Sequence, residues 1–413
     1  MLNSDRAPLW KRSPSPFVLL TLLVALGLLA CGPKTVEVGV VLPLTGDDAA
    51  YGQAALRGVE LAFDALEGAE ETRFELNVMD SGSDPAEAAR LLGELYDQGA
   101  LVAIGGVTPG EAVSMADVAD AAERVLLSPS SGSEVLSAKS RYFYRLAPAD
   151  VTAGNTMAHL MRREYEKDIT AATLAIDATV AAGVEAGFSS SFRSQGGEIL
   201  GAFEGEASGA LDAILELDPD LVYLAGLGSD LADAVDGLRA GGFEGKILTT
   251  REAGHRSTLD SVADAAEGLR YTSTVLDLGS EQAQAFANAY RERFDETSES
   301  PAPSLYTAEA YDAFNVLVAA FDGRPAIASS ARKGLRDGVK NFPGVTGTLQ
   351  FNESGEVSKF PRVYRLAEDL TVIDEKQWLQ AERERIEAER QAILERLRNI
   401  QGGGAGSVTA AGS

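Results

Sequence analysis

The chain has 413 residues, of which 45% are hydrophobic, enough apolar material for two or three packed domains. The formal net charge at pH 7 is −26, which argues against a nucleic-acid-binding protein and against electrostatic attachment to an anionic membrane. Because the chain holds a single cysteine, no disulfide can form within it.

Residues 1–30 are predicted to be a secretory signal. Lys11 and Arg12 precede an apolar run, 17–30, that is shorter than the roughly 20 residues a helix needs to cross a bilayer. A basic flank, a short apolar segment and a small residue at its end are typical of a signal peptide. An uncleaved membrane anchor is the alternative interpretation.

The only cysteine, Cys31, directly follows Leu28-Leu-Ala30. This segment resembles the lipobox of bacterial lipoproteins, in which the cysteine is lipidated and becomes the new N-terminus. The resemblance implies a lipid anchor at Cys31, with the mature protein in the cell envelope, extracytoplasmic or facing the periplasm. Without a lipid, the lone thiol would be an exposed reactive group.

From Thr35 to about Ile373, predicted strands and helices alternate. The stretch 51–67 is predicted to be a helix because its apolar residues recur at helical spacing. Asp84 and Pro85 are expected to cap and start another helix, which runs to about Gln98. The predicted strands are 36–42, 74–79, 101–105, 125–127, 171–176, 198–203, 221–225 and 246–248. Such alternation is typical of parallel sheets with helices on both faces, and the number of units favours two α/β lobes.

The C-terminal region has a different character. Residues 374–400 are predicted to form a charged helix, and 401–413 a disordered tail of small residues. The apolar residues of the helix that are spaced by seven are Leu379, Ile386, Ile393 and Ile400. A single seam of this kind is a thin coiled-coil signal. It is also compatible with a solvated or self-docked terminal helix.

Signatures of catalysis are poor. The two histidines, His159 and His255, have no cysteine or second histidine at metal-ligand spacing. No G-x-S-x-G motif is present, and the stretch 240–247 fails as a phosphate-binding loop at both ends. We therefore expect no enzyme activity, no catalytic residue, no metal and no cofactor.

Hydroxyl side chains and glycines gather where the predicted strands end. The loops 105–110 and 128–134 both combine serine or threonine with glycine and proline. In open α/β sheets, ligands bind beyond the carboxyl ends of the strands, and helix starts with hydroxyls beside them favour anions. Glu252, at another strand end, could hold an ammonium group across a cleft. At each position taken alone, an ordinary turn or helix cap is the alternative.

The order of several short motifs resembles the type I periplasmic binding proteins, specifically the Leu/Ile/Val-binding group of ABC transporters. The matching motifs are Val40-Val-Leu-Pro-Leu-Thr-Gly46, Tyr51-Gly52, Asp80 with Asp84-Pro85, Ile104-Gly105-Gly106, Leu127-Ser-Pro129, Ala263-Asp-Ala-Ala-Glu-Gly268, Tyr311-Asp-Ala313, Gly347-Thr-Leu-Gln-Phe351 and Gly355. The resemblance extends over residues 36–366. It implies an α/β fold of two Rossmann-like lobes with parallel sheets, joined by three hinge crossings and closing on a ligand between them.

The resemblance also divides the chain. Residues 35–146 and 275–345 would form lobe 1, and residues 147–274 and 346–373 would form lobe 2. The three crossings would fall near 146–148, 271–274 and 346–349. The charged helix, 374–400, would lie outside both lobes.

Ligand-binding residues are implied by matching positions. Those carried over are Thr108, Pro109, Gly110, Ser130, Ser131, Gly132, Ser133, Asp177, Leu227 and Glu252. The two loops of lobe 1 would hold a ligand carboxylate, and Glu252 would pair with its amino group. Pro109 and Gly132 stand where the family has a serine and a threonine, and Leu227 stands where it often has an aromatic residue. These departures weaken any claim to a branched-chain amino acid and indicate a roomier pocket or a different ligand.

The expected function is therefore that of a lipid-anchored solute-binding protein of an ABC importer. It would bind a small polar molecule such as an amino acid and deliver it to a membrane permease. The alternative is a binding-fold lipoprotein that regulates an envelope partner, contacted through the C-terminal helix. Nucleic acid is not an expected partner.

Overall fold

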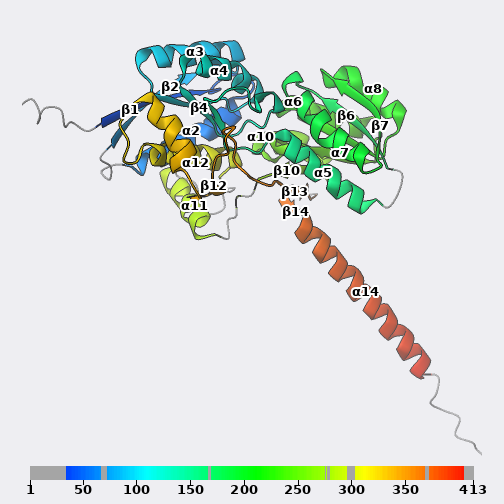
Figure 1. Ribbon diagram of the computed structural model, residues 1–413. Helices are drawn as coiled ribbons and strands as arrows, with labels where there is room; N and C mark the ends of the chain where they lie inside the picture. The colour runs from blue at the N-terminus through cyan, green and yellow to red at the C-terminus, as the bar shows by residue number, and fades with distance from the viewer. Residues whose placement is uncertain are drawn as a thin grey trace, which may run out of the picture.

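The structure is a computed structural model that describes residues 34–66, 72–165, 169–274, 276, 280–294, 303–367 and 372–403. The predicted signal, the lipidation site Cys31 and most of the predicted tail lie outside these residues. Two α/β lobes lie side by side, and one long helix projects from them (Figure 1). Within the described residues, no helix is long and apolar enough to cross a membrane.

The sheet of lobe 1 has five parallel strands in the order β2-β1-β3-β4-β5. Their bounds are Lys34–Leu42 for β1, Thr72–Asp80 for β2, Val102–Gly105 for β3, Val125–Ser128 for β4 and Phe143–Arg145 for β5. Side chains of a strand point alternately to the two faces of a sheet, and β1 is apolar at both sets of positions. Val38 and Val40 belong to one core cluster, and Val41 belongs to the cluster on the opposite face.

Helices cover both faces of the lobe 1 sheet (Figure 1). Helices α2 (Ala49–Asp64) and α12 (Leu305–Phe321) pack together on one face. On the other face lie α3 (Pro85–Gln98) and α4 (Pro109–Ala122). The shorter elements are η1 (Glu134–Leu136), α11 (Glu281–Arg293), α13 (Ala328–Lys333), η5 (Gly334–Gly338), β11 (Phe342–Gly344) and β12 (Gly347–Leu349). The predicted cap is confirmed at α3, where the Asp84 carboxylate accepts the Ala86 N–H at 2.8 Å.

The sheet of lobe 2 has seven strands in the order β14-β13-β10-β9-β8-β6-β7. Their bounds are Thr170–Ala175 for β6, Glu198–Glu204 for β7, Leu221–Ala225 for β8, Lys246–Thr249 for β9, Arg270–Ser273 for β10, Arg362–Leu366 for β13 and Val372–Asp374 for β14. The strands β6 to β10 run parallel, and β13 and β14 add an antiparallel edge. The strand positions predicted from sequence are confirmed to within two residues.

Two layers of helices flank the lobe 2 sheet. One face carries α5 (Asp150–Glu164) and the continuous helical run α6 (Ala178–Gly183), η2 (Val184–Ser189) and α7 (Ser190–Ser194). The other face carries α8 (Ala207–Leu217), α9 (Gly228–Ala240), η3 (Arg251–Gly254), α10 (Arg256–Val262) and η4 (Ala263–Ala266). Each lobe thus has its own core, with the strand ends of both available to build a shared site.

The third crossing between the lobes comes later in the chain than the sequence predicts. The predicted boundary assigns residues from 346 onward to lobe 2. In the structure, Leu349, Phe351 and Val357 are buried in the lobe 1 core. After this segment, the chain returns to the lobe 2 sheet at β13. The apolar residues beyond the predicted boundary pack in the lobe 1 core. Because these contacts join residues far apart in the sequence, strand periodicity does not predict them.

The C-terminal helix α14 (Glu375–Gly403) is attached to lobe 2 by its first turn alone. Glu375 is buried and pairs with Arg365 at 2.8 Å and with Arg270 at 3.2 Å. The Arg365 guanidinium also lies 3.8 Å from the centre of a ring of Trp378. Beyond this turn the helix projects away from both lobes (Figure 1). Ile386 and Ile393, of the predicted seam, are 53% and 56% exposed, so these two residues do not pack on the lobes, whereas Leu379 is half-buried near the docked turn.

Candidate functional site at the junction of the lobes

The loop that begins at the end of β4 uses most of its hydroxyls to hold itself in place. Ser128 Oγ donates to the Gly106 carbonyl at 2.7 Å, and Ser130 Oγ donates to the Val107 carbonyl at 2.8 Å. These bonds tie the loop 128–134 to the loop after β3. Ser131 Oγ is buried and has no hydrogen-bond partner within the described residues. Of these hydroxyls, Ser131 is therefore the one left for a ligand, since buried polar groups are rarely unpaired.

Ser133 connects the two lobes. Its hydroxyl donates to the Thr179 carbonyl in α6 at 2.6 Å, and its own carbonyl accepts from Arg145 Nη1 at 2.8 Å. Arg145 is fully buried and also pairs with Glu356. The predicted clamp loop thus contacts the opposite lobe directly.

Tyr51 makes a second direct contact between the lobes. Its hydroxyl, from α2 of lobe 1, accepts the Gly228 N–H at 2.9 Å and lies 3.1 Å from the Thr258 hydroxyl. Both partners belong to lobe 2. The contacts of Ser133 and Tyr51 together describe a closed arrangement of the two lobes.

The absence of a side chain at Gly132 has a local cause. A Cβ built there would lie 2.2 Å from Oδ1 of Asp150 and 3.0 Å from the Pro148 carbonyl. Asp150 is the first residue of α5, and its N–H donates to the Gly132 carbonyl at 2.8 Å. The space that a threonine side chain would need is filled by the Asp150 carboxylate.

Asp150 and Glu252 are two carboxylates close enough to repel each other. Desolvation raises the pKa of Asp150 to about 7, and the Glu252 charge contributes, while Arg145 and Arg251 oppose the rise. Desolvation also raises the pKa of Glu252, against the lowering effect of Arg251. Carboxylates in such an environment favour a cationic partner, which would stabilise their ionised forms.

Asp150 is a candidate site residue that the sequence does not predict. The sequence signal for it is weak, because an aspartate that opens a helix after a proline reads as an ordinary helix start. What distinguishes Asp150 is its approach to Gly132 and Glu252, which are separated from it in sequence by 18 and 102 residues. Only the fold brings the three together.

The remaining predicted residues lie at the starts of helices near the same junction. Thr108 and Pro109 are the N-cap and first residue of α4, and Gly110 follows them. Asp177 caps α6 by accepting the Thr179 N–H at 2.7 Å. Leu227 precedes α9 and packs against the lobe 1 core from lobe 2.

Little at this junction favours catalysis. Within the described residues, no group of three histidine, cysteine, aspartate or glutamate side chains is placed to hold a metal ion. Burial lowers the pKa of His255 to about 4, so its imidazole is neutral at pH 7. Its ring packs against Tyr51 with centroids 4.6 Å apart. This environment suits a packing residue better than a general base.

Comparison with known proteins decides the family. Residues 35–368 match the family model described as periplasmic binding protein. The chain is a member of the periplasmic binding protein family. The match covers both lobes except the edge strand β14, and it ends before α14. The prediction of family and fold class is therefore confirmed.

Individual relatives of this periplasmic binding protein are distant. The leucine-, isoleucine-, valine-, threonine- and alanine-binding protein of Pseudomonas aeruginosa is 20% identical over 349 residues, covering 82% of this chain and 91% of its own. A solved leucine-binding protein, LivK of Thermotoga maritima, has a TM-score of 0.75 at 23% identity, with 82% and 97% of the two chains covered. A solute-binding protein of an ABC transporter from R. palustris, solved with benzoate, has a TM-score of 0.72 at 20% identity, with 82% and 95% covered.

All three relatives are named as binding proteins, and one of them as the solute-binding protein of an ABC transporter. Their ligands, by name, range from amino acids to an aromatic acid. The periplasmic binding protein fold is therefore shared while the ligand varies.

Proposed function

We propose that this protein is a lipid-anchored, extracytoplasmic solute-binding protein of an ABC importer, which binds an amino acid or a similar small polar ligand between its lobes. The pairing of Asp150 with Glu252 beside the loop 128–134 carries the proposal. Two carboxylates with raised pKa values gain most from an ammonium group placed between them. The proposed clamp consists of this pair together with the residues predicted from sequence.

The opposite side of the clamp suits a carboxylate. Helix α4 begins at Pro109, so the N–H groups of Gly110 and Glu111 in its first turn have no acceptor within the helix. Desolvation raises the pKa of the buried Glu111 carboxyl in this turn to about 7, which keeps it neutral below that pH. Helix starts favour negative charge, and Ser131 Oγ is an additional donor without a partner within the described chain. A donor-rich side and an acidic side together fit a zwitterion.

A matched pair of ligands tests the proposal. Each α-amino acid is compared with the α-hydroxy acid of the same side chain by thermal shift of the full chain. A ligand at 100 times its dissociation constant adds about 2.7 kcal/mol of stability, which is readily measured. We expect stabilisation by at least one amino acid and none by its hydroxy analogue. Equal stabilisation by both would remove the ammonium group from the proposed clamp.

Amino-acid affinity is expected to rise with pH between about 5.5 and 8. The pKa of Asp150 is raised to about 7, so below that pH the carboxyl is mostly protonated. The proton must leave before the carboxylate can pair with the ligand's ammonium group. The effect approaches tenfold per pH unit well below the pKa. The free energy of unfolding of the ligand-free protein depends on pH with the opposite sign. The raised pKa contributes stability that is lost as pH rises from about 4 through 7. Calorimetric titration of the Asp150→Asn variant should give a flatter pH profile, and an unchanged profile would contradict the role of Asp150.

Changing Cys31 to serine should abolish acylation and leave folding intact. Cys31 is the only thiol in the chain, so no other residue can carry a thioether-linked lipid. Metabolic labelling with a radioactive fatty acid checks this directly, with the melting temperature as the control for folding. A labelled serine variant would overturn the lipid anchor.

A regulatory role is the second candidate, and the projection of α14 favours it. Its isoleucines 386 and 393 are exposed beyond the docked first turn, where a partner could reach them. A chain ending at residue 380 keeps Glu375 and Trp378 and should bind its ligand with unchanged affinity. Loss of an envelope phenotype in this truncated chain, with affinity unchanged, would support the regulatory role. A fall in affinity would show that α14 takes part in the clamp.

A further inference from the structure

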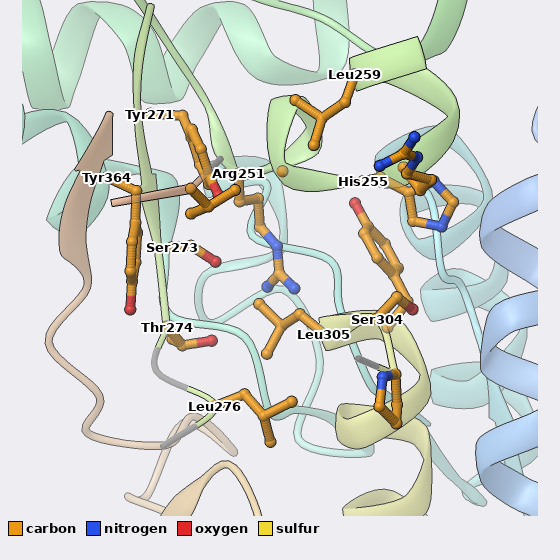
Figure 2. Close-up of a pocket in the computed structure, with 15 residues that line it drawn as sticks. Arg251, His255, Leu259, Tyr271, Ser273, Thr274, Leu276, Ser304, Leu305 and Tyr364 are labelled. Carbon is orange, nitrogen blue, oxygen red and sulfur yellow. The ribbon is translucent and has the colours of Figure 1, made fainter. Parts of the chain in front are cut away.

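A cavity of about 320 Å³ lies where the two lobes meet beside the second crossing (Figure 2). Lobe 2 contributes η3, the start of α10 and the end of β10, and lobe 1 contributes residues 303–306 at the start of α12. Its volume falls at the lower end of the range of small-molecule sites, roughly 300–1,000 Å³.

Arg251 extends into this cavity (Figure 2). The side chain is 8% exposed. Its Nη2 pairs with Glu309 at 2.5 Å, and its guanidinium lies 5.3 Å from the ring centre of Tyr306. Helix α12 therefore holds the guanidinium on two sides.

Two donors of Arg251 remain unpaired. Nε and Nη1 are buried and have no hydrogen-bond partner within the described residues. A ligand in the cavity would reach them through a small rotation of the guanidinium. Leaving a buried donor unsatisfied is unfavourable, and more so when the donor belongs to a charged group. An acceptor bound in the cavity would recover this energy, and a carboxylate is the acceptor that a guanidinium binds best.

The rest of the lining suits a flat apolar body. Tyr271 and Tyr364 stack with ring centroids 5.6 Å apart, and both line the cavity, as do Leu259 and Leu305. Ser273 adds a hydroxyl beside Arg251 (Figure 2). Arg256 lines the cavity as well, but it is paired with Asp260 at 2.7 Å. A charged group in a mostly apolar and aromatic lining is the common composition of a small-molecule site.

The cavity is separate from the proposed clamp. His255 and Tyr306 line it, and both pack on Tyr51, with centroids 4.6 and 4.9 Å from the Tyr51 ring. No residue of the proposed clamp is among those described as lining the cavity. A neighbouring cavity of about 10 Å³, which does reach Asp150, has room for about one water. An amino acid could therefore enter the proposed clamp only when the lobes move apart from this closed arrangement.

We propose that the larger cavity is a second ligand site, which binds a small aromatic carboxylate through Arg251. The acid group would accept from the unpaired donors of Arg251, and the ring would lie among Tyr271, Tyr364 and the leucines. Different residues form this site and the amino-acid clamp, although Arg251 also lines the small cavity that reaches Asp150.

Benzoate is the probe, titrated by calorimetry into the full chain. We expect a dissociation constant of about 1 mM or tighter. In Arg251→Lys the cation opposite Glu309 is kept while the Nε and Nη1 donors are lost, so binding should weaken about tenfold or more. Ser273→Leu fills the cavity without touching the ion pair and should also weaken binding about tenfold or more. Melting temperatures establish that each variant folds. If Arg251→Lys does not fold, the effect of Ser273→Leu on benzoate binding tests the proposal.

Ser131→Ala is the matched control in the proposed clamp and should leave benzoate binding unchanged. Benzoate binding lost in Ser131→Ala and retained in Ser273→Leu would place benzoate in the clamp and overturn the proposal. Absence of benzoate binding at millimolar concentration would overturn it as well. Amino-acid binding is measured in the same variants, so failure of the second site is distinguished from failure of the clamp.

Discussion

Replacing Glu252 by glutamine is expected to weaken amino-acid binding by roughly 30- to 1,000-fold, or about 2–4 kcal/mol. Glutamine keeps the shape of the side chain and removes its charge, so the ligand's ammonium loses a partner in a desolvated site. Most of the cost comes from an ammonium that remains buried without its counter-charge. Calorimetric titration at about pH 8, where the Asp150 carboxyl is ionised, measures the loss.

The neighbouring carboxylate modifies this expectation. The Glu252 charge helps to raise the pKa of Asp150, so below about pH 7 its removal lets Asp150 ionise more readily and compensates part of the loss, whereas at about pH 8 the full loss is measured. The double variant Asp150→Asn/Glu252→Gln should therefore bind more weakly than either single variant. Ser131→Ala, on the carboxylate side, should cost only about 1 kcal/mol because backbone N–H groups remain. Unchanged affinity in Glu252→Gln would make a ligand without an amino group the better candidate.

Gly132→Ala is expected to reduce affinity by about 100-fold or more and to lower stability by about 1–3 kcal/mol. The added Cβ would lie 2.2 Å from Asp150 Oδ1, so the carboxylate must leave its position in the clamp. The added Cβ would also lie 3.0 Å from the Pro148 carbonyl oxygen, so it cannot avoid the clash by moving toward Pro148. Denaturant unfolding and ligand titration together measure both effects.

Two further variants separate the clash from a general effect of alanine. A Cβ added at Gly209, in α8, would meet no atom within 4 Å, so Gly209→Ala should be neutral or slightly stabilising. Adding Asp150→Ala to Gly132→Ala removes the clash and should restore stability without restoring affinity. Full affinity in Gly132→Ala alone would show that the Asp150 carboxylate is not needed where the structure places it.

The order of strands and helices follows from local sequence pattern. The buried strands are short apolar runs, and the helices carry apolar residues at helical spacing with capping residues such as Asp84 at their starts. These signals depend on residues close together in the chain, so they can be recognised without a structure. The same holds for the division into two α/β lobes and for the resemblance to the periplasmic binding proteins, which the family match confirms.

Contacts between distant residues had to come from the tertiary structure. Four serines lie at and just after the end of β4, yet only the fold shows that Ser128 and Ser130 are tied to the neighbouring loop while Ser131 Oγ is left without a partner in the described chain. Asp150 belongs to the proposed clamp only because α5 begins against Gly132.

The sequence by itself determined the elements, the two lobes and Glu252 as the expected partner of an amino group. The tertiary structure decided which hydroxyl remains available, which second carboxylate accompanies Glu252, and where the chain makes its third crossing. Secondary structure follows from periodicity over a few residues. A binding site depends on side chains brought together from more than 100 positions apart, as Asp150 and Glu252 are, and no local pattern encodes their approach.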